Sequence, residues 1–230
     1  MGLGLGTNVY TNSYVITEAA AYVNTHSLFM DGTNDYAEIG GTSDTFFGTG
    51  DFTISFWVKF GNHSAGNHYL FNRGRMFSTG TWDANDHMQI IYSASQDKMQ
   101  FSATIGGSAN FRTFTGATLS VTDDTWFHFA ITNDKDGGTD NLKLYKNGSF
   151  VDDQTAINGN VAVAGSQFGL NSYANGNRRN LEYDEIAIHH TVLDADNIAA
   201  IYNSGSPIDL SADSGNYNTS SSLAHWWKLN

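Results

Sequence analysis

The sequence contains no cysteine and only one proline among its 230 residues. Without cysteine there can be no disulfide, no thiolate metal site and no cysteine nucleophile. Basic residues are also scarce, since 11 Lys and Arg stand against 23 Asp and Glu, giving a formal net charge of −12. Binding to nucleic-acid phosphates needs clustered positive charge, so a nucleic-acid partner is not expected. No apolar run approaches the roughly 20 residues that span a bilayer, and no membrane insertion is expected.

The first 26 residues contain neither Lys nor Arg and no continuous apolar stretch, so they do not have the pattern of a secretory signal. They also lack the alternation of a packed strand. We therefore predict that residues 1–26 form an N-terminal arm. Strand signals with short turns follow from residue 27 onward without a break in composition, which predicts one domain over residues 27–230.

Aromatic residues make up 13% of the chain, and many of them alternate with polar residues. In "FTISFWVKF" (52–60), every second residue from Phe52 to Phe60 is apolar, and Trp57 lies on the opposite face. This period of two is typical of a β-strand. Similar patterns predict strands on both sides of residues 95–97, over residues 126–134, and in a hairpin whose Asn147-Gly148 pair favours a type I′ turn.

One helix is predicted, over residues 194–203. Asp194 is a good N-cap, Leu193 and Ile198 have the spacing of a hydrophobic staple, and Gly205 follows as the expected stop signal. The last segment, "SLAHWWKLN", predicts a strand. Its two adjacent tryptophans would point to opposite faces, so at least one should be buried.

Five segments occur in an order that resembles the laminin-G-like and pentraxin-like branch of the concanavalin A-like lectin/glucanase superfamily. They are residues 27–39, 51–60, 125–134, 142–151 and 182–205. They contain a D-G-x-x-D-Y turn, a W-x-H strand before a Y-x-N-G hairpin, and a D-E strand before a short capped helix. The resemblance implies an all-β fold, a two-sheet antiparallel jelly-roll sandwich with one short helix near the C-terminus.

The segment "NLEYDEIAIHH" (180–190) carries three carboxylates within four positions. Glucanases of the wider superfamily use an E-x-D-x-E strand. Alternation puts Glu182 and Asp184 on one face here, but Ile186 stands at the third position and Glu185 points to the other face. We therefore expect that the protein is not an enzyme, and a glucanase-type glycoside hydrolase remains the alternative.

The resemblance also implies a Ca²⁺ site at the margin of the sandwich. Carried over to this sequence, its ligands would be Asp31, Asn34 and Asp184, completed by carbonyl groups and water. The alternative is that the first two residues only make turn hydrogen bonds.

Two loops offer an aromatic ring beside amide and charged groups, which is the combination that binds sugars. The predicted carbohydrate-binding residues are Trp82, Asp83, Asp86, His87, Tyr173, Asn175 and Arg178. The alternative is that both loops are ordinary solvated turns.

These observations predict a non-catalytic carbohydrate-binding or adhesive domain. Such domains act outside cells, but this chain shows no secretory signal. A phage virion surface protein, which is made in the cytoplasm and released by lysis, would have both properties. The expected partner is a surface glycan or a neighbouring virion protein, and the arm suggests a homo-oligomer. A purely structural decoration protein without a glycan ligand is the second alternative.

Overall fold

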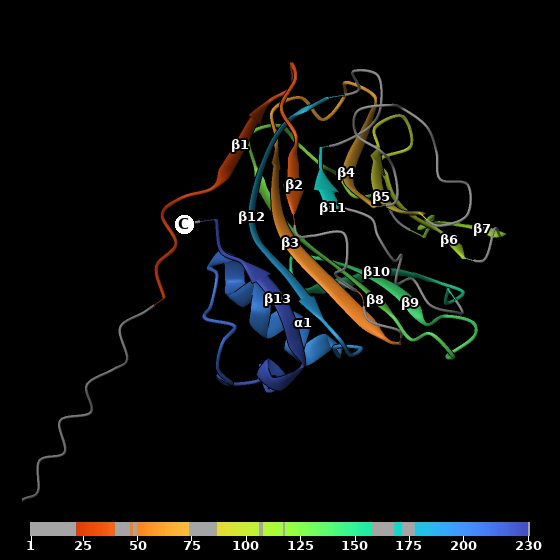
Figure 1. Cartoon of the computed structure of the whole chain (residues 1–230), viewed down its shortest axis with the longest axis vertical. Helices are drawn as coiled ribbons and strands as arrows, with labels where there is room; N and C mark the ends of the chain where they lie inside the picture. The colour runs from red at the N-terminus through yellow and green to blue at the C-terminus, as the bar shows by residue number, and fades with distance from the viewer. Residues whose placement is uncertain are drawn as a thin grey trace, which may run out of the picture.

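Two antiparallel sheets face each other in the computed structural model (Figure 1). The structure describes residues 22–39, 47, 50–73, 87–105, 108–116, 118–157, 168–171 and 178–229. Within these residues, the secondary structure is nearly all β, with one α-helix near the C-terminus. The fold is therefore the all-β, two-sheet sandwich that the sequence predicts.

The first sheet has seven strands in the order β1-β12-β3-β8-β9-β10, with β13 also paired to β12. Its strands are β1 (Leu28–Asp31), β3 (Phe52–Phe60), β8 (Trp126–Asn133), β9 (Leu142–Lys146), β10 (Ser149–Gln154), β12 (Asn180–His189) and β13 (Leu223–Trp227). Along one edge, β12 pairs with β1 through its first half and with β13 through its second half. The N-terminal and C-terminal strands thus share one partner.

The second sheet has six strands in the order β2-β11-β4-β5-β6-β7. Its strands are β2 (Ala37–Ile39), β4 (Asn67–Arg73), β5 (His87–Ser93), β6 (Lys98–Ile105), β7 (Ser108–Thr113) and β11 (Phe168–Leu170). Strands β5 and β6 are joined by the predicted turn around residues 95–97.

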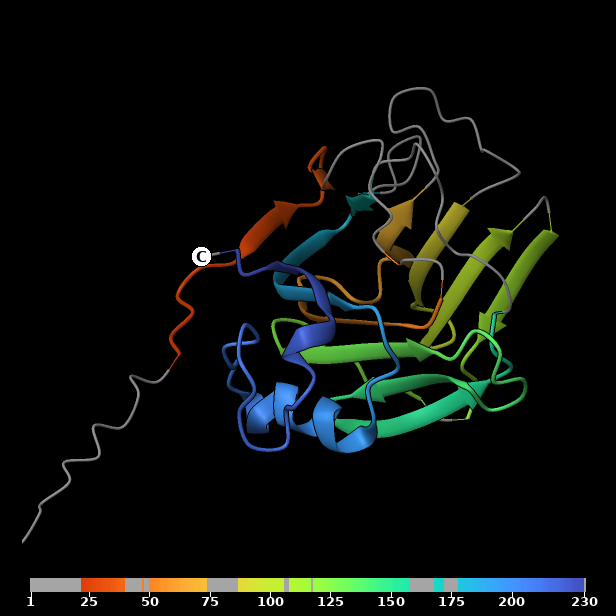
Figure 2. The same ribbon diagram turned by 60° about the horizontal axis from the view of Figure 1, so that its bottom comes forward.

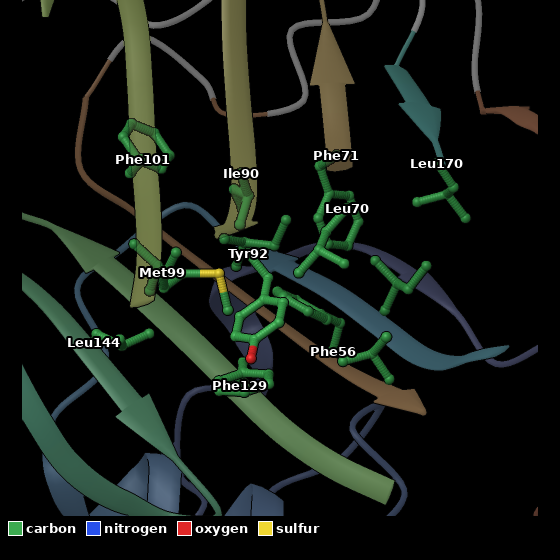
Figure 3. Packing of buried hydrophobic residues seen from close by; sticks show 14 of the residues in the cluster. Phe56, Leu70, Phe71, Ile90, Tyr92, Met99, Phe101, Phe129, Leu144 and Leu170 are labelled. Carbon is green, nitrogen blue, oxygen red and sulfur yellow. The ribbon is translucent and has the colours of Figure 1, made fainter. Parts of the chain in front are cut away.

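The main core lies between the sheets. The alternate residues of β3 that the sequence assigned to one face, Phe52, Ile54, Phe56, Val58 and Phe60, are all fully buried there. Figure 3 shows Tyr92 of the six-stranded sheet pointing toward Phe129 of the seven-stranded sheet, and Phe101 contacts Phe52 of β3, with ring centroids 5.9 Å apart. Fully burying one such side chain contributes about 1.5–3 kcal/mol to the free energy of folding, so this face of β3 supplies a large part of the hydrophobic driving force for folding.

A smaller core covers the outer face of the seven-stranded sheet. There α1 (Ala195–Tyr202) and the residues after it pack against Ala130 and Tyr145 of β8 and β9 (Figure 2). Leu193 and Ile198 belong to this cluster, as the staple predicts. The Asp194 side chain accepts a hydrogen bond from the Asn197 amide, so the predicted N-cap is confirmed.

The end of α1 differs from the prediction. The helix stops at Tyr202 because Asn203 takes a left-handed conformation (φ 43°) and its N–H donates to Ala199 O. Asn tolerates this conformation, so the helix does not need the glycine at position 205 as its stop. Asn203–Gly205 and Ser220–Ser222 form short 3₁₀ turns.

The hairpin between β9 and β10 is as predicted. Asn147 (φ 49°) and Gly148 (φ 74°) both have positive φ, as a type I′ turn requires. At the other end of the domain, Trp227 packs on the main core and Trp226 on the outer cluster, so the two rings point to opposite faces. Both are half-buried, whereas the sequence predicted that at least one of them would be buried. None of the helices in the described part of the chain is long and apolar enough to cross a membrane.

Candidate ligand-binding site

A β-bulge interrupts β12 at the acidic segment. Asp184 pairs with Trp57 of β3, but the next pair is Ala187 with Ser55, so β12 has one residue more than its partner. Glu185 lies in the bulge and has a left-handed backbone conformation, with φ 48°. Such a bulge shifts the alternation by one position.

The bulge overturns two predictions about this segment. Strict alternation placed Glu185 on the face opposite Asp184 and placed Ile186 beside Asp184. In the structure, Ile186 lies in the main core together with Tyr183, and Asp184 and Glu185 both lie toward the outer side. Ile186 therefore does not occupy the third acid position of an E-x-D-x-E strand, and that argument against catalysis no longer holds.

One amide group connects the two carboxylates. Asn24 Nδ2 donates to Asp184 Oδ1 (2.8 Å), to Glu185 Oε1 and to Lys228 O (2.8 Å). The amide lies at the point of β12 where β1 begins and β13 ends. Figure 1 shows residues 22–27 running beside the C-terminal end of the chain. The Asn24 side chain thus fastens both ends of the domain to the bulge.

Glu185 is a structural acceptor. It is 4% exposed and also accepts hydrogen bonds from Tyr22 Oη (2.7 Å) and Trp226 Nε1 (2.6 Å). Burial raises the pKa of Glu185, and these donors act in the opposite direction. Tyr22 and Asn24 belong to the segment assigned to the arm, so the boundary at residue 27 does not separate them from the sandwich.

Asp184 faces a cavity of about 150 Å³. The lining residues come from five separate segments: Asn24, Trp57, Trp126, Asp184, Gly205 and Pro207. Burial, followed by the charge of Glu185, raises the pKa of Asp184 to about 7. Asp184 Oδ1 accepts from Asn24 and from the Glu185 amide, and Oδ2 has no hydrogen-bond donor among the described residues. That oxygen is available to a ligand.

The two indole rings differ in their freedom. Trp57 is buried and fixed, because it stacks on Tyr202 (centroids 5.5 Å apart) and lies 5.3 Å from the His128 ring. Burial lowers the pKa of His128 to about 3, so this histidine is neutral. Trp126 is only half-buried, with Lys59 Nζ 5.1 Å from its ring centroid. Trp126 is therefore the wall of the cavity that a ligand can reach most readily.

The predicted calcium ligands do not meet. Asp31 pairs with Asn180, four residues before Asp184 on β12, which is about 13 Å along a strand. Ca²⁺ binds its oxygens at about 2.3–2.6 Å, so one ion cannot contact both carboxylates. Asp31 Oδ1 instead accepts from the Thr33 amide (2.7 Å), and Asn34 is exposed in the same turn.

The described residues contain no group of three or more acidic or histidine side chains that could hold a metal ion. The prediction that Asp31 and Asp184 bind the same Ca²⁺ ion is therefore wrong. Calcium binding by the Asp31 turn alone stays a prediction.

Most of the predicted sugar-binding residues, Trp82, Asp83, Asp86, Tyr173 and Asn175, lie outside the described residues. Of the other two, His87 begins β5 beside the end of β4. Arg178 precedes Arg179, whose Nε donates to Asn67 O at the start of β4. His87 and Arg178 thus lie at opposite ends of β4, about 20 Å apart for seven extended residues. The Arg178 guanidinium lies 4.7 Å from the Tyr36 ring and donates to Asn171 O, so it has structural partners.

The sequence interpretation missed Asn24, Trp126 and Pro207 as site residues. Trp57 was noticed only as an aromatic residue on the face of its strand opposite the core. The same signal was present at Trp126, since Phe127 and Phe129 face the core and the register puts Trp126 on the outer face. Two tryptophans on the outer face of neighbouring strands could have indicated a site.

Comparison with known proteins supports the fold. A laminin G family model, described as concanavalin A-like lectin/glucanases superfamily, matches residues 31–199. No curated protein matches the sequence.

Among solved structures, the binding domain of botulinum neurotoxin serotype D is similar with a TM-score of 0.58 and 15% identity, covering 81% of this chain and 44% of that one. Domain 4 of AbnA, a GH43 extracellular arabinanase from Geobacillus stearothermophilus, solved in complex with arabinotriose, has a TM-score of 0.54 and 15% identity. That match covers 77% of this chain and 82% of that one. This chain spans less than half the length of the toxin domain. At such identities, the similarity shows the fold alone.

Proposed function

Because the chain belongs to the concanavalin A-like lectin/glucanases superfamily, we propose that it is a non-catalytic carbohydrate-binding domain whose ligand enters the cavity beside Trp126 and Asp184. One observation carries the proposal: an accessible indole ring and a carboxylate oxygen that accepts no hydrogen bond from the described residues line the same cavity. Sugars present an apolar ring face and hydroxyl donors, which these two groups match. The arabinotriose bound to domain 4 of AbnA supports the proposal as an analogy of fold.

The size of the cavity limits what it holds. A drug-sized ligand needs about 300–1,000 Å³, and this cavity has about 150 Å³. It is suited to a single sugar ring or one ring of a longer chain. Asp184 would accept a hydroxyl hydrogen bond, and the Asn24 amide keeps that carboxylate in place.

A hydrolase is the second candidate, because Asp184 and Glu185 lie on the same side and the pKa of Asp184 is about 7, as a general acid requires. A retaining mechanism also needs a second carboxylate that reaches the anomeric carbon. Glu185 is almost completely buried and already accepts from three donors. Glu182 is held by Lys59 and by the Ser27 hydroxyl. We therefore propose binding without catalysis.

A glycan array with the purified full chain tests the binding proposal. Trp126→Ala should weaken every positive signal about tenfold or more, the size expected for a central aromatic anchor. Phe150→Ala is the matched control, because Phe150 is exposed on β10, an edge strand that is two strands away from Trp126 in the same sheet. Equal signals from the two variants would contradict the proposed site. Release of reducing ends from a bound glycan, lost in Asp184→Asn, would contradict the non-catalytic reading.

The proposed setting is a virion surface, with a glycan or a neighbouring virion protein as partner and the N-terminal arm as the point of attachment in a homo-oligomer. The support comes from the sequence: apart from Glu18, residues 1–25 carry no charged side chain, so they can lie against another protein at little desolvation cost. A purely structural decoration role is the alternative. Deleting residues 2–21 spares Tyr22 and Asn24 and should abolish assembly while leaving the melting temperature unchanged. Normal assembly of the truncated chain would contradict this setting.

A further inference from the structure

We propose that the cavity adjoins, at Trp126, a longer binding strip that runs across four strands of the seven-stranded sheet and takes an uncharged oligosaccharide of more than one ring. This rests on the carbohydrate-binding function proposed above. The strip consists of Phe29, Glu182, Lys59 and Trp126. These residues come from β1, β12, β3 and β8 in that order.

The strand register puts the four side chains in one row. Phe29 pairs with Glu182, Glu182 with Lys59, and Lys59 with Trp126. Directly paired residues share a face of the sheet, and this is the outer face, because their neighbours Met30, Leu181, Val58 and Phe127 are buried in the main core. Three steps between neighbouring strands span about 14 Å.

The contacts make the row continuous. The Lys59 ammonium forms an ion pair with Glu182 and lies over the Trp126 ring, and Ser27 Oγ donates to the same Glu182 carboxylate. Phe29, at the far end, is 59% exposed although it is a large apolar side chain. The strip therefore has an accessible ring at each end and a fixed ion pair between them.

This arrangement suits a chain of sugar rings. The rings at the two ends can each pack against the apolar face of a sugar, while the ion pair offers both donors and acceptors to the hydroxyl groups between them. The cavity alone accommodates about one ring, so a ligand that continues along the strip gains contacts that a monosaccharide cannot make.

Charge selects against acidic sugars. Three carboxylates, Glu182, Asp184 and Glu185, lie along this part of β12, and the nearest strip cation, Lys59, is already paired with one of them. The chain as a whole has a net charge of −12. An anionic ligand would meet like charge, so neutral oligosaccharides should be preferred over uronic-acid or sialylated ones.

The experiment measures calorimetric affinity for the neutral glycan that binds best on the array, as a monosaccharide and as oligomers of increasing length. Affinity should rise about tenfold or more between the monosaccharide and the trisaccharide, and Phe29→Ala should remove that gain while leaving monosaccharide binding unchanged. Trp126→Ala should weaken all lengths. Phe111→Ala is the matched control, because Phe111 is 65% exposed on the six-stranded sheet.

The outcomes separate the two proposals. If Trp126→Ala weakens binding but Phe29→Ala does not and affinity is independent of length, the strip is wrong and the cavity remains. If neither variant matters, or if no glycan binds, both proposals fail. Glu182→Gln leaves the Lys59 ammonium without its carboxylate partner and should reduce the preference for neutral over acidic oligosaccharides. If the unmodified protein binds acidic oligosaccharides more tightly than neutral ones, the proposed ligand class is wrong. Binding of a peptide at the same residues, without any glycan, would also overturn it.

Discussion

Replacing Asp184 by Asn should stabilise the protein at pH 8 and change its stability little at pH 4. Asp184 is partly buried beside Glu185, and its pKa is raised from 3.8 to about 7. The ionised form is therefore disfavoured in the folded state. The folded protein therefore has its full stability below about pH 4, where Asp184 is protonated in both states. It loses part of its unfolding free energy as the pH rises through 7, because the folded state must then hold the ionised carboxylate. Asn cannot ionise, so the variant avoids this loss.

The size of the effect follows from the pKa. A shift of about three units corresponds to roughly 4 kcal/mol for a fully buried group. Asp184 opens onto a cavity and is partly screened by solvent, so about 1–2 kcal/mol is a better expectation. For a chain of this size, that is a rise in melting temperature of about 2–8 °C. The Asn carbonyl can still accept from Asn24 and from the Glu185 amide, so the Oδ1 hydrogen bonds are kept.

The assay is urea denaturation of both proteins at each unit from pH 4 to pH 8. The control is Asp136→Asn, because Asp136 is an exposed carboxylate on a loop away from the bulge. The difference in unfolding free energy between Asp184→Asn and the unmodified protein should grow from pH 4 to pH 8, and the control should show no such trend. A constant difference, or a variant that is less stable at pH 8, would refute the reasoning.

Three further predictions concern other contacts. Asn24→Ala removes one donor from each of Asp184, Glu185 and Lys228 O and should lower the unfolding free energy by about 2–3 kcal/mol in urea titration, whereas Thr25→Ala, at an exposed neighbour, should change it little. Alanine tolerates the left-handed conformation at φ 49° less well than asparagine, and Asn147→Ala also removes the acceptor of the His128 amide, so it should cost about 1–3 kcal/mol of unfolding free energy. Asn147→Gly loses the same acceptor without the strain and should cost less; equal losses would show that backbone strain is unimportant. If calcium binds at the Asp31 turn alone, EDTA should lower the melting temperature of the unmodified protein and of Asp184→Asn equally, and should not affect Asp31→Ala; an unchanged melt in all three would dismiss calcium.

Local sequence patterns predicted most of the secondary structure. The alternation in β3, the Asn147-Gly148 turn and the Asp194 cap each depend on a few neighbouring residues, and all three are present in the structure. The order of the strand segments did the rest, because the resemblance supplied a topology that alternation alone does not contain.

The site was harder to predict because it depends on one inserted residue and on distant partners. A single bulge residue, Glu185, changes the face of the sheet on which each later residue of β12 lies. No periodic pattern in the sequence shows where such an insertion occurs. Asn24 and Asp184 are 160 positions apart, so no local signal connects them. The separation of Asp31 from Asp184 likewise depends on the register of β1 against β12.

The fastening of both chain ends to one bulge has a consequence during synthesis. Strand β12 cannot complete its edge until both β1 and β13 are present, and β13 is made after β12. Until residues 226–228 have been made and have docked, Asn24 lacks Lys228, and Glu185 lacks Trp226. A nascent chain therefore displays an unfinished edge beside the future cavity until β13 pairs with β12. Ligand binding would then report the docking of β13, because the junction that holds Asp184 in place closes only with that strand.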